Sequence, residues 1–98
     1  MKEKVIKLIY DSIDEVNKMN ELTITKNVDT VLFGRDSDLD SLGLVNLIVS
    51  IEGLVNESFD TSISIADEKA MSQKNSPFRT VETLANYVEL LIKEEQNG

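Results

Sequence analysis

Residues 41–57 form the longest helical apolar run of the chain and most constrain its fold. Nine of these seventeen residues are apolar, and in a helix they would cover more than one face. Such a helix is either buried on several sides or presents an apolar strip to a partner. Gly53 lies within the run and predicts a kink or a close packing contact, since glycine costs about 1 kcal/mol relative to alanine in a helix. A chain of 98 residues has room for a single modest core.

Two further segments repeat apolar residues at spacings of three and four, as amphipathic helices do. One runs from about Lys2 to Met19, and the other from about Val81 to Lys93, with Thr80 at the N-cap position. A short fourth helix is expected near residues 66–71, and no internal repeat is apparent. The sequence therefore predicts an all-α fold: a small four-helix bundle, with three principal helices and one short helix, in a single domain spanning residues 1–98.

A long loop is expected between the first two principal helices, because about 20 residues there lack a strong period. Residues 22–25 could form a short strand, but a lone strand has nothing to pair with. The loop is instead expected to pack on the core through its apolar side chains, which are Leu22, Ile24, Val31, Leu32 and Phe33.

The net charge of −8 arises in one part of the chain. Residues 29–68 contain nine acidic residues and one basic residue, and the remainder is balanced. An acidic surface attracts basic protein partners and argues against nucleic acid or an anionic membrane. The chain has neither Cys nor His, which excludes disulfides, the usual zinc centres and the common nucleophilic triads. We therefore expect a non-catalytic protein without a metal centre.

The location is predicted from the absence of targeting and membrane signals. No apolar run approaches the roughly 20 residues of a membrane span. Lys7 and Asp11 interrupt the N-terminal apolar stretch, so it does not form a signal-peptide core. We expect a cytoplasmic monomer.

An aspartate-rich loop precedes the middle helix. Asp36, Asp38 and Asp40 match the opening of an EF-hand calcium loop. In that register Ser41 replaces the glycine of the sharp turn and Leu47 replaces the bidentate glutamate, so an EF-hand is not expected. Weak binding of divalent ions remains an alternative, and Asp40 and Ser41 would also serve as ordinary helix caps.

Asp40-Ser41-Leu42 lies where this acidic loop ends and the apolar helix begins. In that setting the tripeptide resembles the signature of the acyl carrier proteins, which opens the second helix of a four-helix bundle. The resemblance covers nearly the whole chain. It implies that Ser41 receives a 4'-phosphopantetheine arm from coenzyme A, added by a separate magnesium-dependent phosphopantetheinyl transferase. The thiol of the arm would then carry acyl groups as thioesters between enzymes of a fatty-acid, polyketide or specialised acyl pathway.

The chemistry of the three signature residues fits that role. A serine hydroxyl without an adjacent base is a weak nucleophile, so Ser41 would be a passive acceptor activated by the transferase. The start of a helix favours an anion such as a phosphodiester. Asp40 would orient the site, and Leu42 would anchor the helix start in the core so that Ser41 points outward.

The resemblance also implies docking of partner enzymes with basic surfaces on the middle helix. The expected contacts are an apolar strip and two acids, namely Leu44, Val45, Val49, Glu52 and Glu57. Family members often carry more acids here, so partners from a dedicated pathway are as consistent as general fatty-acid enzymes. An acyl chain would be sheltered between core residues, with Leu47, Ile51, Leu84 and Val88 as candidate walls.

Two alternatives stay open at this point. The first is a carrier of aminoacyl or peptidyl groups, which uses the same serine and arm. The second is an acidic divalent-ion-binding or docking module without a prosthetic group.

Overall fold

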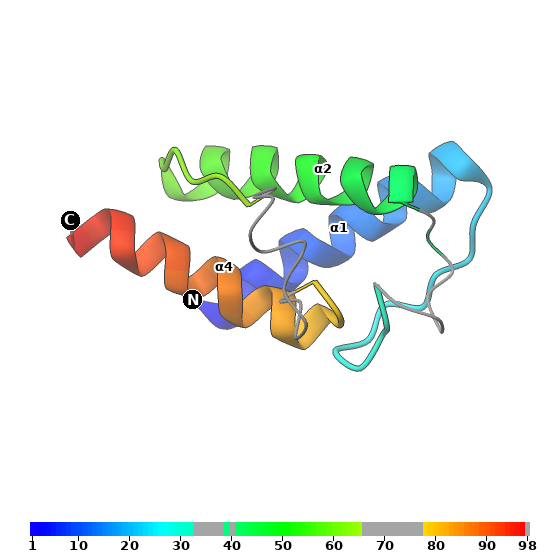
Figure 1. Cartoon of the computed structure of the whole chain (residues 1–98), viewed down its shortest axis with the longest axis horizontal. Helices are drawn as coiled ribbons and strands as arrows, with labels where there is room; N and C mark the ends of the chain where they lie inside the picture. Colours follow the sequence, from blue (N-terminus) through cyan, green and yellow to red (C-terminus); the bar gives the residue numbers. More distant parts are fainter. Residues whose placement is uncertain (33–38, 40, 66–77, 98) are drawn as a thin grey trace.

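In a computed structural model of the protein, the described residues are 1–32, 39, 41–65 and 78–97, and this part of the chain contains three α-helices (Figure 1). The helices are α1 (Lys2–Asn20), α2 (Ser41–Phe59) and α4 (Val81–Asn97). These residues contain no strand, so the all-α prediction is confirmed. The short helix expected near residues 66–71 lies outside the described residues.

The observed helices match the predicted segments and run slightly further at their C-terminal ends. α4 continues four residues beyond the predicted end at Lys93. Its last turns have a tertiary contact, because the carboxylate of Glu95 accepts hydrogen bonds from the Ser62 N–H at 2.9 and 3.0 Å. This bond joins the end of α4 to the segment that follows α2.

α1 packs against both other helices and runs antiparallel to α2. The Nζ of Lys4, near the start of α1, lies 4.9 Å from the ring centroid of Phe59 at the end of α2. In the middle of the two helices, Ser50 Oγ lies 3.3 Å from Ser12 Oγ. The end of α1 and the start of α2 therefore lie together, at the end of the molecule opposite the C-terminus (Figure 1).

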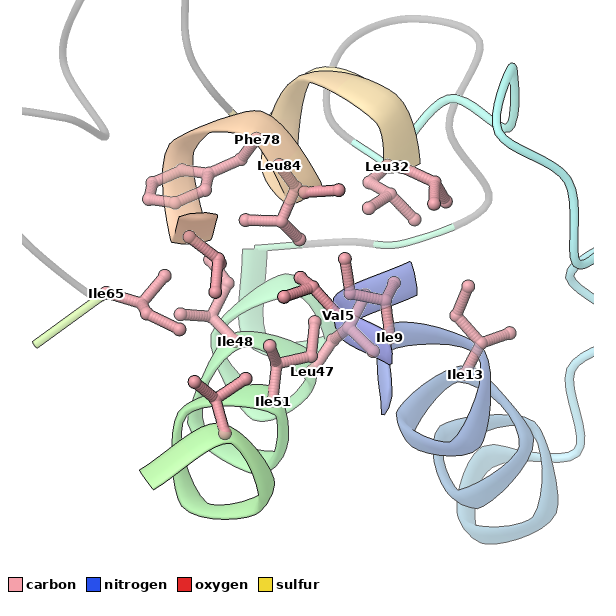
Figure 2. Close-up of a cluster of buried hydrophobic side chains, with 14 of the residues drawn as sticks. Val5, Ile9, Ile13, Leu32, Leu47, Ile48, Ile51, Ile65, Phe78 and Leu84 are labelled. Carbon is pink, nitrogen blue, oxygen red and sulfur yellow. The ribbon is translucent and has the colours of Figure 1, made fainter. Parts of the chain in front are cut away.

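One apolar core is shared by the helices and by the segments between them (Figure 2). Ile65 and Phe78, from the connecting segments, lie beside Ile48 of α2 and Leu84 of α4. Each fully buried aliphatic or aromatic side chain contributes about 1.5–3 kcal/mol relative to its exposed state. The four residues named as candidate walls for an acyl chain are all fully buried members of this core, namely Leu47, Ile51, Leu84 and Val88.

The first long segment packs on the core through Leu22, Ile24 and Leu32, which confirms that part of the prediction. Phe33 lies outside the described residues, and Val31 is half-buried. Ile24 and Leu32 are buried, and residues 22–25 form no strand. The Leu32 N–H donates to the Arg79 carbonyl at 2.7 Å, and the Val81 N–H donates to the Thr30 carbonyl at 3.1 Å. The segment is thus held against the start of α4 through backbone bonds.

Thr80 caps α4 as the sequence predicts. The Thr83 N–H donates to Thr80 Oγ1 at 3.2 Å, and the Thr80 N–H donates to Thr83 Oγ1 at 3.0 Å. This reciprocal arrangement is a capping box in which threonine takes the place of the usual glutamate or glutamine.

Asn17 fixes the chain after α1. Beyond the helix, Glu21 adopts a left-handed conformation with φ of 54°, which reverses the direction of the backbone. The Oδ1 of Asn17 then accepts a hydrogen bond from the Ile24 N–H at 2.9 Å, and its Nδ2 donates to the Ile24 carbonyl at 3.1 Å. Ile24 is thereby held at the edge of the core, where it is buried.

Asn56 fixes the chain after α2 in the same way, by hydrogen bonds from its side chain. Asp60 is left-handed, with φ of 53°, and Asn56 exchanges hydrogen bonds of 2.9 and 3.1 Å with the backbone of Ile63. The Thr61 hydroxyl also donates to Asn56 Oδ1, at 2.8 Å. The pattern Asn-x3-acid-x2-Ile, in residues 17–24 and 56–63, thus gives the ends of α1 and α2 the same local hydrogen-bond arrangement.

Gly53 marks neither a close contact nor a break in α2. A Cβ atom at this position would meet nothing within 4 Å, and the helix continues from Ser41 to Phe59. The expectation of close packing is wrong, because Gly53 lies on the exposed side of the helix.

Candidate functional site

Ser41 is the first residue of α2, at the end of the molecule where α1 also ends. Its side chain, Asp40 and the aspartates at 36 and 38 lie outside the described residues. The roles expected for Asp40 and for the acidic loop therefore stay predictions. Within the described residues, no group of three Asp, Glu, His or Cys side chains could hold a metal ion.

The backbone position of Ser41 suits an attached phosphodiester. The positive end of the helix dipole lies at this terminus and stabilises a nearby anion by about 0.3–1 kcal/mol. The first turn of α2 contains no acidic residue that would oppose a negative charge there. The first turn of α2 therefore favours an anion such as a phosphodiester, and the nearest acid in the sequence is Asp40, directly before Ser41.

Leu42 is exposed rather than buried. Its fractional exposure is 69%, so the expectation that it anchors the helix start in the core is wrong. The reason is the helical register. Successive side chains turn by about 100°, which places Leu42 about 200° from Leu44, and Leu44 belongs to the core face.

Leu44 is buried, so the expectation that it is a docking contact is wrong. It is only 2% exposed, and with Leu47, Ile48, Ile51 and Val55 it forms the face of α2 that packs in the core. Leu44 therefore cannot be a surface contact for a docked enzyme.

An apolar strip does lie on the outer face of α2, with Leu42 in place of Leu44. Leu42, Val45 and Val49 are 69%, 37% and 57% exposed, and their spacings of three and four residues put them on one side of the helix. The strip begins at the residue that follows Ser41. Contiguous exposed apolar residues are typical of interaction surfaces.

The two acids expected beside this strip lie further along the helix. Glu52 is half-buried and Glu57 is exposed. Both come after the strip, so the charge that α2 itself offers a partner is concentrated in its second half.

A polar contact joins α1 and α2 near the middle of both helices. Ser50 Oγ lies 3.1 Å from Glu15 Oε2 and 3.3 Å from Ser12 Oγ. Ser12 is fully buried, and the serine pair gives its hydroxyl a partner between the helices. The hydroxyl of Ser50 carries one proton, which goes to the carboxylate because a charged acceptor forms the stronger hydrogen bond. Glu15 is thus fixed against α2.

The expectation that no apolar run approaches a membrane span is wrong by length and composition alone, because Leu42–Phe59 of α2 is long and apolar enough to cross a membrane, with a mean hydropathy of 1.3. Core helices of soluble proteins meet the same criterion. In this protein the hydropathy comes from two sources, namely the buried face centred on Ile48 and Ile51 and the exposed strip.

No protein-family model, no curated protein and no solved structure matches the chain. A function is therefore assigned from the residues at the start of α2 and from the surface beside them.

Sequence reasoning missed Leu42 as a surface residue and Glu15 as a neighbour of α2. The spacing from Leu42 to Val45 and Val49 was a usable signal, because these residues share a face that excludes Leu44. Glu15 had no such signal, since its contact with Ser50 joins residues far apart in the sequence.

Proposed function

We propose that the chain is a carrier protein whose Ser41 is modified with 4'-phosphopantetheine and whose arm carries acyl groups as thioesters. The observation that carries the proposal is the Asp40-Ser41-Leu42 signature at the first residues of a helix with an exposed apolar strip. The signature supplies the acceptor, and the strip supplies a surface that an enzyme would cover while it reaches the arm.

Attachment is a phosphoryl-type transfer carried out by a separate transferase. The Ser41 Oγ attacks the phosphorus that bears the pantetheine group of coenzyme A and forms a phosphodiester. The phosphoanhydride bond breaks, and adenosine 3',5'-bisphosphate leaves. The serine proton passes to a base of the transferase, because this chain has no His and no Cys to accept it.

The arm would supply the chemistry that the chain lacks. Thioesters need a thiol, and the chain contains no Cys, so the thiol has to come from the attached group. The chain's own contribution is to hold the arm at the start of α2, with the helix dipole favouring the phosphate and no acid in the first turn opposing it.

Docking of partner enzymes would use the outer face of α2. Leu42, Val45 and Val49 form its apolar part, and Glu52 and Glu57 attract a basic surface. Interfaces of this kind combine an apolar centre with a charged rim that guides encounter. The proposed partners are the phosphopantetheinyl transferase and the enzymes that load, modify or remove the acyl group.

The direct test is enzymatic loading of the purified chain. The protein is incubated with coenzyme A, Mg²⁺ and a phosphopantetheinyl transferase of broad specificity, and its intact mass is measured. We expect one phosphopantetheine-sized addition, which is absent in Ser41→Ala and retained in Ser58→Ala, a matched change at an exposed serine of the same helix. Circular dichroism of Ser41→Ala confirms that the fold is kept. A wild-type chain that stays unmodified contradicts the proposal.

A further inference from the structure

We draw no further inference here: the strongest candidate, the exposed apolar face of α2 formed by Leu42, Val45 and Val49, carries none because nothing in the part of the chain that the structure describes shows what covers it.

Discussion

At the scale of single residues, Asn56 organises the chain after α2 mainly through its side chain, while its carbonyl accepts from the Thr61 N–H at 3.1 Å. It accepts from the Ile63 N–H and the Thr61 hydroxyl, and it donates to the Ile63 carbonyl. These bonds give the backbone partners that a helix interior would otherwise provide, and they hold Ile63 in the core. Asn17 has the same function after α1, which makes the two asparagines the main local determinants of where the connecting segments begin.

We predict that Asn56→Ala lowers the free energy of unfolding by about 1–3 kcal/mol, because it leaves the part-buried backbone groups of Ile63 without their partners. The measurement is urea denaturation followed by circular dichroism. Asn86→Ala, at an exposed position of α4, is the control and should stay within about 0.5 kcal/mol of the wild type. Equal stability of the two variants would show that the asparagine bonds contribute nothing specific.

The sequence predicts a hydrogen bond of a single residue where its bonding partner is only a few residues away. Thr80 was predicted as a cap, and its bonds with Thr83 confirm the prediction. The bonds of Asn17 and Asn56 were not predicted, because each depends on a left-handed residue, Glu21 or Asp60, that brings the chain back onto the helix end. Nothing in helical periodicity reports such a reversal.

At the scale of elements, α2 carries two apolar faces with different roles. One face, which includes Leu44 and Ile48, is buried in the core. The other face exposes Leu42, Val45 and Val49. The sequence predicted that a helix this apolar would be buried on several sides or show a strip to a partner, and the structure contains both features. The division of residues between the faces was wrong for Leu42 and Leu44, because a helix that is apolar on several sides does not itself indicate which side meets the core.

The two faces of α2 should respond differently to truncation. Leu44→Ala is expected to lower the free energy of unfolding by about 2–5 kcal/mol, because it leaves a cavity in the core. Val49→Ala removes a side chain that is largely exposed, so its stability should change by less than about 1 kcal/mol while its loading by the transferase slows. Thermal or urea denaturation and intact-mass kinetics measure the two effects. A stable Leu44→Ala variant, or a Val49→Ala variant loaded at the wild-type rate, would contradict this division.

Helix positions were predictable because each helix has a strong apolar period and a clear start. Ser41 and Val81 begin α2 and α4 as expected, and α1 begins at Lys2. The C-terminal ends were less accurate because tertiary contacts extend them, as the bond between Glu95 and Ser62 does for α4. The expected helix near residues 66–71 stays a prediction.

At the scale of the whole molecule, the antiparallel packing of α1 and α2 combines charge from one helix with apolar surface from the other. The end of α1 and the start of α2 lie together, and Glu15 contacts Ser50 at the middle of α2. Glu52 and Glu57 extend the acidic character along the second half of that helix. Under the proposed carrier function, a basic partner would meet these carboxylates from the middle of α2 onward.

The charge of this surface gives a salt-dependent prediction. The double variant Glu52→Lys with Glu57→Lys should slow loading more at low salt than at high salt, because screening weakens the lost attraction. The ratio of wild-type to variant kcat/KM at the two salt concentrations measures the effect. A ratio that does not change with ionic strength would show that Glu52 and Glu57 do not attract the transferase electrostatically.

The most direct measurement of the central claim is peptide mapping of the loaded protein by tandem mass spectrometry. Trypsin releases residues 36–69 as one peptide, and fragmentation separates Ser41 from the other serines within it. The account predicts a single phosphopantetheine group on Ser41. An unmodified peptide after treatment with an active transferase, or an arm on any other serine, would contradict it.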